Sequence, residues 1–324
     1  MDTAERSGTR AWWYAWITVL VLVAVFFTVR GCAFMPWNEG QESVVVRLSI
    51  TRDFGGEVLR DEDVEVREGS SAMQALQKAA EVETSYGGGF IRAVDGLVSG
   101  YDGEGSSKTD WFYYVNGQMA EVGAGDFEVR DGDWLIFDYH SWEYSVFTPA
   151  FAGCFPEPFV HGFREAPREC LIVCAPGCED SGERLAEVLR EAGAPTCDLE
   201  DLNPGWRPRQ GEYAVVVGTA AELAKNHFIA EASANAARIG LTAYIAGADI
   251  LLVDGKGEAS GCLASGEGLI EAIGPRLGEE GSALMVIGTD VEGVRAAVGR
   301  LAGWDNRSSG PAMVVFAGAD MDGR

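Results

Sequence analysis

The sequence predicts a chain of three parts: an N-terminal transmembrane helix, an α+β domain beside the membrane, and an α/β domain with a mostly parallel sheet. The first observation is an uncharged, apolar run over residues 11–29. The second is a set of alternating strand patterns around one helical pattern over residues 43–147. The third is a series of short Val/Ile/Leu-rich runs that alternate with helical patterns over residues 169–324. Residues 30–42 and 148–168 are predicted to connect these parts.

Composition restricts the classes of partner. The 324 residues include 25 Lys and Arg against 50 Asp and Glu, which gives a formal net charge of −25. Nucleic-acid recognition rests on clustered Lys and Arg, so this balance argues against a nucleic-acid partner. No long block of like charges occurs, so the acidity is spread over a folded surface. A hydrophobic content of 47% excludes wholesale disorder.

Residues 11–29 have the length and composition of a membrane-spanning helix. At about 1.5 Å per residue this run spans about 28 Å, close to the hydrocarbon thickness of a bilayer. Aromatic residues gather at its start, as in an interfacial belt: Trp12, Trp13, Tyr14 and Trp16. Arg6 and Arg10 precede the run and Arg30 follows it, so the long acidic remainder decides the orientation. We expect residues 1–10 in the cytoplasm and everything after the helix outside, in a single-pass protein of the cell membrane.

Two alternatives to a retained anchor fit less well. A cleaved signal peptide has a shorter apolar core and small residues at the cleavage site, unlike the sequence Phe26–Gly31. Cys32 follows Gly31 as in a lipoprotein cleavage site, but Val29 and Arg30 stand where small residues are expected. A retained transmembrane helix is therefore the prediction.

The predicted location outside the cytoplasm permits disulfides. The chain has seven cysteines, and without the juxtamembrane Cys32 six remain, which allow fifteen pairings. Cys170, Cys174 and Cys178 follow one another at intervals of four, a spacing typical of neither a zinc nor an iron–sulfur site. Cys170 and Cys174 share one face of a predicted strand, so buried thiols are expected there. A Cys178–Cys197 disulfide remains an alternative.

The first outer domain is predicted to be a sheet with one helix. Residues 43–54 alternate apolar and polar positions, a Gly-Gly turn follows, and residues 57–67 return as a second strand. Ser71 and Gln74 form a capping box that begins a helix, which we expect to extend to about Glu83. Three strand-like runs broken by Gly and Asp turns come next. The order β-β-α-β-β-β predicts a β-grasp sheet with one helix packed across it.

Five motifs follow one another in this domain: Gly69 with Ala75-Leu76, Tyr86-Gly87-Gly88-Gly89-Phe90-Ile91, Asp95-Gly96-Leu97, Trp111-Phe112-Tyr113-Tyr114-Val115-Asn116-Gly117 and Asp131-Gly132-Asp133. This ordered set resembles the transcobalamin-like C-terminal domain family, over about residues 44–140. In the animal cobalamin carriers of that family the fold closes over one face of the corrin ring, and an α-helical barrel supplies the other face. This sequence has no counterpart of the barrel, so the resemblance implies a surface module with one half of such a site.

The residues themselves indicate where a flat ligand would bind. In the strand Trp111–Val115, alternate aromatic side chains face opposite sides, so one face packs on the helix and the other is exposed or meets a neighbour. The glycines of the Tyr86–Phe90 loop would let a ligand approach the backbone. The alternative is that the aromatics fill a small core. The candidate ligand-contact residues are Tyr86, Gly88, Phe90, Trp111, Phe112, Tyr113, Tyr114 and Asn116, and the ligand that the resemblance implies is cobalamin or another corrinoid.

The second outer domain follows a linker rich in Pro and Phe, whose phenylalanines are expected to fasten it to one domain or the other. Short apolar runs predict five strands, at residues 170–175, 213–219, 248–255, 283–289 and 312–318. Helices are predicted between them, at residues 181–192, 220–239, 268–277 and 291–301. Continuous apolar strands that alternate with helices predict a parallel sheet covered on both faces.

Two strand ends repeat the pattern Gly-Thr with a Glu three residues after the Thr. Thr219 is followed by Glu222, and Thr289 by Glu292. A Gly turn that opens a helix can bind an anion, but Thr and Glu at this spacing also form a capping box, which we expect at both positions. The repeat, within residues 213–304, is faintly similar to the outer α/β module of archaeal and bacterial surface-layer proteins, which implies a structural role at the cell surface.

No catalytic or metal-binding signature occurs in the sequence. It lacks a Walker loop, HExxH and GxSxG, and no GxGxxG follows a strand. Asp131-Gly132-Asp133 lacks the spaced oxygen ligands of a calcium loop and is predicted to be a turn. The predicted function is a non-enzymatic, membrane-anchored protein that binds a flat ligand outside the cytoplasm and passes it to a transporter or another envelope protein. The alternative is a structural or protein-interaction module of the envelope with no small ligand.

Overall fold

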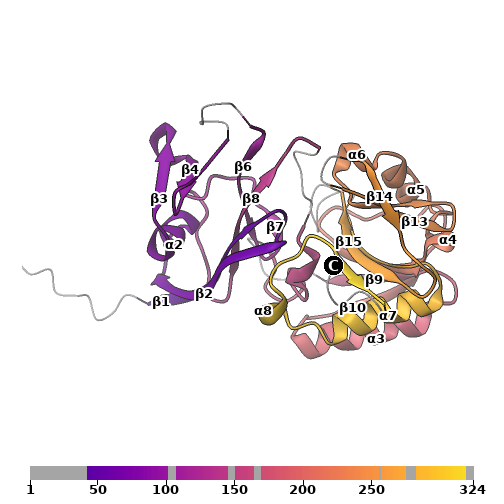
Figure 1. Cartoon of the computed structure of the whole chain (residues 1–324). Coiled ribbons are helices and arrows are strands. Elements are labelled where there is room, and N and C mark those ends of the chain that lie inside the picture. The colour runs from indigo at the N-terminus through magenta and orange to yellow at the C-terminus, as the bar shows by residue number, and fades with distance from the viewer. Residues whose placement is uncertain are drawn as a thin grey trace, which may run out of the picture. The chain divides into compact units, whose positions relative to one another are not determined.

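The computed structural model describes residues 42–100, 107–144, 150–163, 169–254, 257–274 and 282–318. The predicted transmembrane segment, residues 11–29, lies outside the described residues, as do the predicted segments on either side of it up to residue 41. Among the described residues no helix is long and apolar enough to cross a membrane. From Ser43 onward the chain forms one compact unit of mixed α and β structure, dominated by strands (Figure 1).

The first sheet has five strands in the order β2-β1-β8-β6-β7. Strands β1 and β8 are parallel, and the other neighbours are antiparallel. Its strands are β1 (Ser43–Arg52), β2 (Glu57–Arg67), β6 (Thr109–Val115), β7 (Gln118–Met119) and β8 (Trp134–Ser141). A first hairpin, a helix packed on the sheet and a later strand parallel to β1 give a mixed α+β arrangement, as the order of elements predicted, but residues 82–98 form a separate sheet.

Helix α2 (Ala72–Ala79) begins at the predicted capping box. The Gln74 N–H donates to Ser71 Oγ at 3.3 Å, and the Ser71 N–H donates to Gln74 Oε1 at 2.8 Å. The helix ends at Ala79 and not near Glu83, because the chain turns there into a second, three-stranded sheet in the order β3-β4-β5. That sheet comprises β3 (Val82–Ser85), the turn η1 (Tyr86–Gly88), β4 (Phe90–Val94) and β5 (Leu97–Val98).

The main sheet of the C-terminal part has six strands in the order β10-β9-β11-β16-β15-β17. The first four are parallel to one another, whereas β15 is antiparallel to both of its neighbours. The strands are β9 (Cys170–Cys174), β10 (Cys197–Asp201), β11 (Tyr213–Thr219), β15 (Gly268–Ile273), β16 (Ala283–Gly288) and β17 (Val315–Ala317). The predicted parallel sheet is therefore present, with an antiparallel pair of strands at one side.

Both faces of this sheet are covered. Helices α3 (Glu179–Ala192) and α7 (Val291–Ala302) pack on one face and share its core. The other face packs against three short helices and a small antiparallel sheet. These are α4 (Ala220–Leu223), α5 (His227–Ala234), α6 (Ala236–Ile239), β12 (Ala243–Ala246), β13 (Asp249–Val253) and β14 (Ala259–Cys262).

Three element predictions in this part are wrong. Residues 268–273 form strand β15 and not the start of a helix, because β16 and β17 pair on its two sides and bury the whole run. Residues 249–253 join the small antiparallel sheet and not the parallel one. The helix expected over residues 220–239 is divided into α4, α5 and α6.

The two expected capping boxes also differ from the structure. Thr219 caps α4, with its Oγ1 accepting the Glu222 N–H at 3.4 Å, but the Glu222 carboxylate pairs with Lys225 Nζ at 2.6 Å. Helix α7 begins at Val291, as predicted, but its cap is Asp290 and not Thr289: the Asp290 Oδ1 accepts the Gly293 N–H at 2.9 Å. The Thr289–Glu292 box is therefore wrong.

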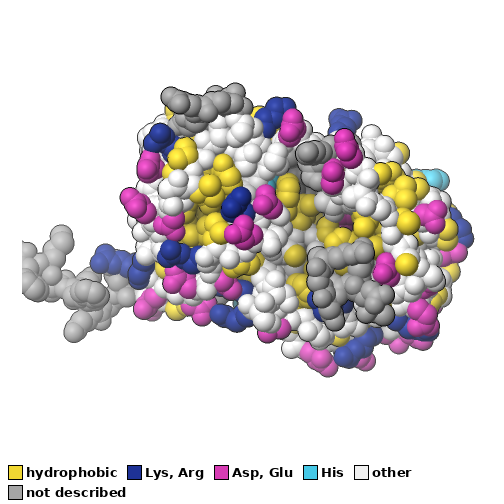
Figure 2. All heavy atoms as spheres, viewed as in Figure 1, with side chains coloured by type: hydrophobic (Ala, Val, Ile, Leu, Met, Phe, Trp, Pro, Cys, Tyr) yellow, Lys and Arg dark blue, Asp and Glu magenta, His cyan; other side chains and the backbone are white. Residues whose placement is uncertain are grey.

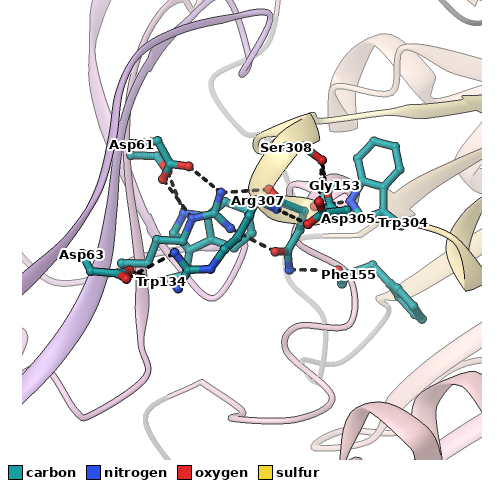
Figure 3. Close-up of polar contacts among 12 residues, drawn as sticks. Asp61, Asp63, Trp134, Gly153, Phe155, Trp304, Asp305, Arg307 and Ser308 are labelled. Carbon is teal, nitrogen blue, oxygen red and sulfur yellow. Dashed lines mark hydrogen bonds and ion pairs between the residues drawn. The ribbon is translucent and has the colours of Figure 1, made fainter.

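Polar contacts join the first sheet, at Asp61 and Asp63, to the C-terminal segment around Arg307 (Figure 3). A buried arginine on the first sheet makes several of them. Arg47 on β1 is 7% exposed, and its guanidinium lies 3.7 Å from the centroid of the Trp134 ring. It donates to the Asp61 carboxylate at 2.9 and 2.6 Å, and to the side-chain and backbone oxygens of Asn306 at 3.0 and 2.8 Å. Burial alone would raise the pKa of Asp61, but hydrogen bonds from Arg47 and Ser49 hold it below its ordinary value. The described partners of this cation thus lie on β2, β8 and α8 (Asn306–Ser309).

Close backbone contacts complete this junction. The Trp304 Nε1 donates to the carbonyl of Gly153, in the turn η2 (Ala152–Cys154), at 2.7 Å (Figure 3). Gly55 has a φ of +80°, and a Cβ placed on it would lie 1.8 Å from the Pro311 carbonyl oxygen. Only glycine leaves room for the C-terminal segment to pass there.

Phenylalanines of the expected linker pack on both sheets. The Phe151 ring contacts Tyr114 of the first sheet edge-on, with centroids 4.5 Å apart. The Phe159 ring contacts Tyr213 of the main C-terminal sheet, with centroids 6.0 Å apart. Both phenylalanines are buried. Residues 150–163 therefore tie the two cores together.

We expect the Arg47→Ala substitution to lower the free energy of unfolding by about 3 kcal/mol, because it leaves the Asp61 carboxylate partly buried and unpaired. Urea denaturation measures the change. Arg307→Ala is the matched control, since Arg307 pairs with Asp63 at 3.1 Å and both side chains are largely exposed, at 63% and 47%. This control should cost at most about 1 kcal/mol. Equal losses in the two variants would contradict the role of Arg47.

A buried carboxyl attaches the small antiparallel sheet to the main one. Glu271 on β15 is 2% exposed and accepts the Thr242 N–H at 2.6 Å, the Thr242 hydroxyl at 2.8 Å and the Ala243 N–H at 3.2 Å. Burial raises the pKa of Glu271 to about 7 despite these hydrogen bonds.

The folded chain therefore holds the Glu271 proton more tightly than the unfolded chain does. This contribution to stability is complete below the ordinary pKa of 4.5 and is lost as the pH rises through about 7. We expect the free energy of unfolding to fall by up to about 3 kcal/mol across that range because of this residue. Denaturation of the Glu271→Gln variant at several pH values should lack this component, and a pH dependence identical to the parent's would refute the assignment.

Candidate functional site

Strand β6 carries four of the candidate residues, and their predicted alternation is confirmed. Trp111 and Val115 lie in the core that α2 covers, with Tyr113 packed at its edge. Phe112 and Tyr114 belong to a second cluster on the opposite face of the sheet. The structure thus shows what covers each face.

On the helix side the aromatic side chains are structural. Trp111 is 7% exposed, and its Nε1 donates to the Leu97 carbonyl at 3.0 Å. The Tyr113 ring stacks on Phe137 with centroids 5.6 Å apart, and its hydroxyl donates to the Val122 carbonyl. These side chains fill the core between the first sheet and α2.

On the opposite side the aromatics meet distant segments. Tyr114 is fully buried under Phe151. Phe112 stacks on the His140 ring at 4.3 Å, and Phe54 stacks on the same ring at 4.1 Å. The face of β6 opposite α2 is therefore covered by distant segments of the chain and not exposed to solvent, which is one of the two possibilities that the sequence analysis gave for it.

Asn116 is a turn residue. Its φ of +50° and the +76° of Gly117 form the two-residue connection between β6 and β7, where Asn-Gly is favoured. Its Nδ2 donates to Asp133 Oδ1 and to the Gly162 carbonyl, both at 2.9 Å, and its Oδ1 accepts the Trp134 N–H at 2.8 Å. The side chain is 1% exposed and its polar groups are used within the protein.

Trp111, Tyr114 and Asn116 therefore offer no surface to a ligand while the core is packed. Truncating a buried aromatic side chain of this kind to alanine costs about 3–5 kcal/mol. A Trp111→Ala, Tyr114→Ala double variant would report on folding and not on ligand binding. The ligand-contact role of these residues is in conflict with their burial.

Tyr86, Gly88 and Phe90 lie away from β6, between β3 and the start of β4, and are at least partly accessible. We call residues 86–90 the Tyr86 hairpin. Tyr86 is 76% exposed and has a φ of +52°, in the left-handed region that is rare for a residue other than glycine. Phe90 is half-buried and contacts Tyr86 edge-on, with ring centroids 6.3 Å apart. Gly87 and Gly88 also have positive φ, and a Cβ on either would meet nothing within 4 Å.

This hairpin can stack on a flat ligand. It presents one exposed aromatic ring and a stretch of unobstructed backbone with free space beside it. At its base the Arg92 guanidinium pairs with the Glu83 carboxylate at 2.6 Å, so the nearest charges on β3 and β4 are of opposite sign. The Tyr86 hairpin can therefore contact a ligand by aromatic stacking and by backbone hydrogen bonds, and it is not arranged for acid–base catalysis.

Sequence reasoning missed a cavity of about 350 Å³ in the C-terminal part. Its walls include Arg207, Phe228, Glu231, Asn235, Arg238 and Ile239. No motif marks these residues, because they come from a loop and two separate helices that only the fold brings together.

The described residues contain no group of three or more His, Cys, Asp or Glu placed to hold a metal ion. Asp131-Gly132-Asp133 forms the expected turn, with a φ of +83° at Gly132 and the Val45 N–H bonded to Asp131 Oδ1 at 2.8 Å. Burial raises the pKa of Asp133, although hydrogen bonds from the Arg130 N–H and from Asn116 oppose that shift.

Charged side chains of both signs surround the hydrophobic ones on the face in Figure 2, in keeping with acidity spread over a folded surface. The six described cysteines are unbridged. Cys170 and Cys174 are buried as expected, whereas the alternative Cys178–Cys197 disulfide is absent.

Comparison with known proteins finds a family match over part of the first sheet. Residues 69–141 match a family described as a domain of unknown function (DUF4430). These residues run from the loop before α2 to the end of β8 and include the Tyr86 hairpin. No curated protein matches the chain in sequence.

Two solved structures show local likeness. Haptocorrin in complex with Cbi is 24% identical over 31% of this chain, with a TM-score of 0.27, and the match covers 26% of the haptocorrin chain. A candidate metal-binding protein from Ruminococcus gnavus ATCC 29149 is 16% identical over 30% of this chain and 97% of its own, with a TM-score of 0.24. The similarity to the surface-layer module over residues 213–304 stays a prediction. The family match is confined to residues 69–141.

Proposed function

We propose that this chain is a non-catalytic ligand-binding protein that acts outside the cytoplasm, is anchored through residues 11–29 and contacts its ligand with the Tyr86 hairpin. The exposure of Tyr86 carries the proposal. A tyrosine 76% exposed on left-handed backbone gains little from folding, so a contact partner outside the chain explains why it is presented there.

The ligand class follows from the geometry of the hairpin. One exposed ring and two glycines with free space beside them suit a flat molecule that stacks on Tyr86 and approaches the backbone. A corrinoid is such a molecule, and the sequence resemblance described above makes cobalamin and cobinamide the first probes. A transporter or envelope protein is the proposed recipient of the ligand.

A second candidate is a structural or protein-interaction module of the envelope. The closed junction favours it, because Arg47, Gly55 and the C-terminal segment fix the two sheets as one unit. In that case Tyr86 contacts another protein and no small molecule binds.

Calorimetric titration of the purified full-length chain in mild detergent distinguishes the two. We expect cobinamide or cobalamin to bind with a Kd near or below about 1 μM, and Tyr86→Ala to weaken binding at least tenfold, which corresponds to about 1.4 kcal/mol. The variant should keep the parent's melting temperature, since an exposed side chain contributes little to stability.

Leu59→Ala is the matched control, because Leu59 is an exposed large apolar residue, at 46%, on a different element. Its affinity should equal the parent's. No heat from the folded parent, or equal affinity in Tyr86→Ala, would reject the hairpin as a ligand site and leave the interaction module ahead.

A further inference from the structure

Cys170 and Cys197 are direct neighbours on adjacent parallel strands. The register of β9 and β10 pairs Cys197 with Cys170, and the Cys170 N–H donates to the Thr196 carbonyl at 3.2 Å. Adjacent strands lie about 4.7–4.9 Å apart, which is within the Cα separation of about 4.4–6.8 Å that a disulfide requires. Cys170 belongs to the core cluster on the α3 side of the sheet and Cys197 packs against that cluster, so their side chains point to the same face.

The two thiols differ in accessibility. Cys170 lies on an inner strand and is 1% exposed. Cys197 lies on β10, the edge strand, and is only half-buried. A reagent in solution therefore reaches Cys197 first, and Cys170 is placed behind it as a second thiol.

The local electrostatics support the same order of reaction. A hydrogen bond from the Cys170 thiol lowers the pKa of Cys197, and the nearby Arg190 cation lowers it further. The same hydrogen bond, together with burial, raises the pKa of Cys170 well above its ordinary value. Cys197 is thus the better nucleophile of the pair.

Cys154, Cys174 and Cys262 lack this arrangement. Cys174, on the same strand as Cys170, has Asp201 and Val217 as its register partners. Cys154 is buried in η2, and Cys262 is exposed on β14. They serve as internal controls for a buried and an accessible thiol.

We infer that Cys170 and Cys197 are a redox site that closes into a reversible intramolecular disulfide. The oxidant is another disulfide, either a small one such as oxidised glutathione or that of a thiol–disulfide oxidoreductase. The Cys197 thiolate attacks one sulfur of it, forms a mixed disulfide and releases the first thiol. The Cys170 thiol gives up its proton, its sulfur attacks Cys197 Sγ, and the second thiol leaves. The chain loses two electrons and two protons, and the external disulfide gains them.

The bridge would fasten the edge of the main sheet. Strand β10 is held on one side only, by β9, and its residues from Asp198 to Asp201 are exposed. A disulfide at its first residue closes the β9–α3–β10 crossover covalently. This gain in edge protection is independent of the proposed ligand function.

The test is peptide mapping of the folded full-length chain after incubation with oxidised glutathione and alkylation of the remaining thiols. We expect the Cys170 and Cys197 peptides to be joined and two hydrogens lighter than their sum, with Cys154 and Cys262 not joined to either. Reductant should lower the melting temperature of the oxidised parent.

Two variants keep the result interpretable. Cys197→Ser should abolish the joined peptide and the response of the melting temperature to reductant, whereas Cys262→Ser should keep both. Free alkylated Cys170 and Cys197 in the folded, oxidant-treated parent would overturn the inference. So would Cys170 or Cys197 joined to a different cysteine.

Discussion

Arg47 is the contact on which the arrangement of this chain depends. A guanidinium that is 7% exposed must keep every hydrogen-bond partner, because an unpaired buried charge costs several kcal/mol. Its partners are Asp61 on β2 and Asn306 on α8, and the Trp134 ring covers its face. One side chain thus fixes a hairpin of the first sheet to Asn306, which lies 259 positions further along the chain.

This constraint decides where binding is available. Gly55 lies directly against Pro311, and Phe151 packs on Tyr114. The outer face of β6 is therefore covered, and its aromatic side chains are part of the core. What the same domain leaves in solvent is the turn between β3 and β4, where Tyr86 is held apart from the core on left-handed backbone. The Tyr86 hairpin, and not the aromatic strand β6, is therefore the part of this domain that is free to contact a ligand.

Local patterns predicted much of the fold. Alternation predicted β1 and the Gly-Gly turn after it predicted the return of β2. The Ser71–Gln74 capping box predicted the start of α2, and short apolar runs predicted β9, β11 and β16. Strand β15 was not predicted as a strand, because a fully buried apolar run shows no hydrophobic period that would distinguish a strand from a helix. The cap of α7 was displaced from Thr289 to Asp290, since either residue type can serve.

The site was harder to predict than the fold. The sequence places aromatics on alternate faces of β6, but it does not reveal that Phe54 and Phe151, from distant segments, cover the outer face. Asn116 lies in one of the motifs on which the family resemblance rests, but its side-chain amide is hydrogen-bonded to Asp133, Gly162 and Trp134. Only the Gly-rich Tyr86–Phe90 segment had a local signal that matched its exposed position.

Hydrogen–deuterium exchange of the full-length chain with and without cobinamide tests the central claim most directly, because it locates the contact. The account predicts slower exchange at residues 86–90 in the presence of cobinamide and unchanged exchange at residues 304–313, which the Arg47 junction holds in both states. Unchanged exchange at the hairpin, or protection confined to the cavity residues 228–239, would contradict it.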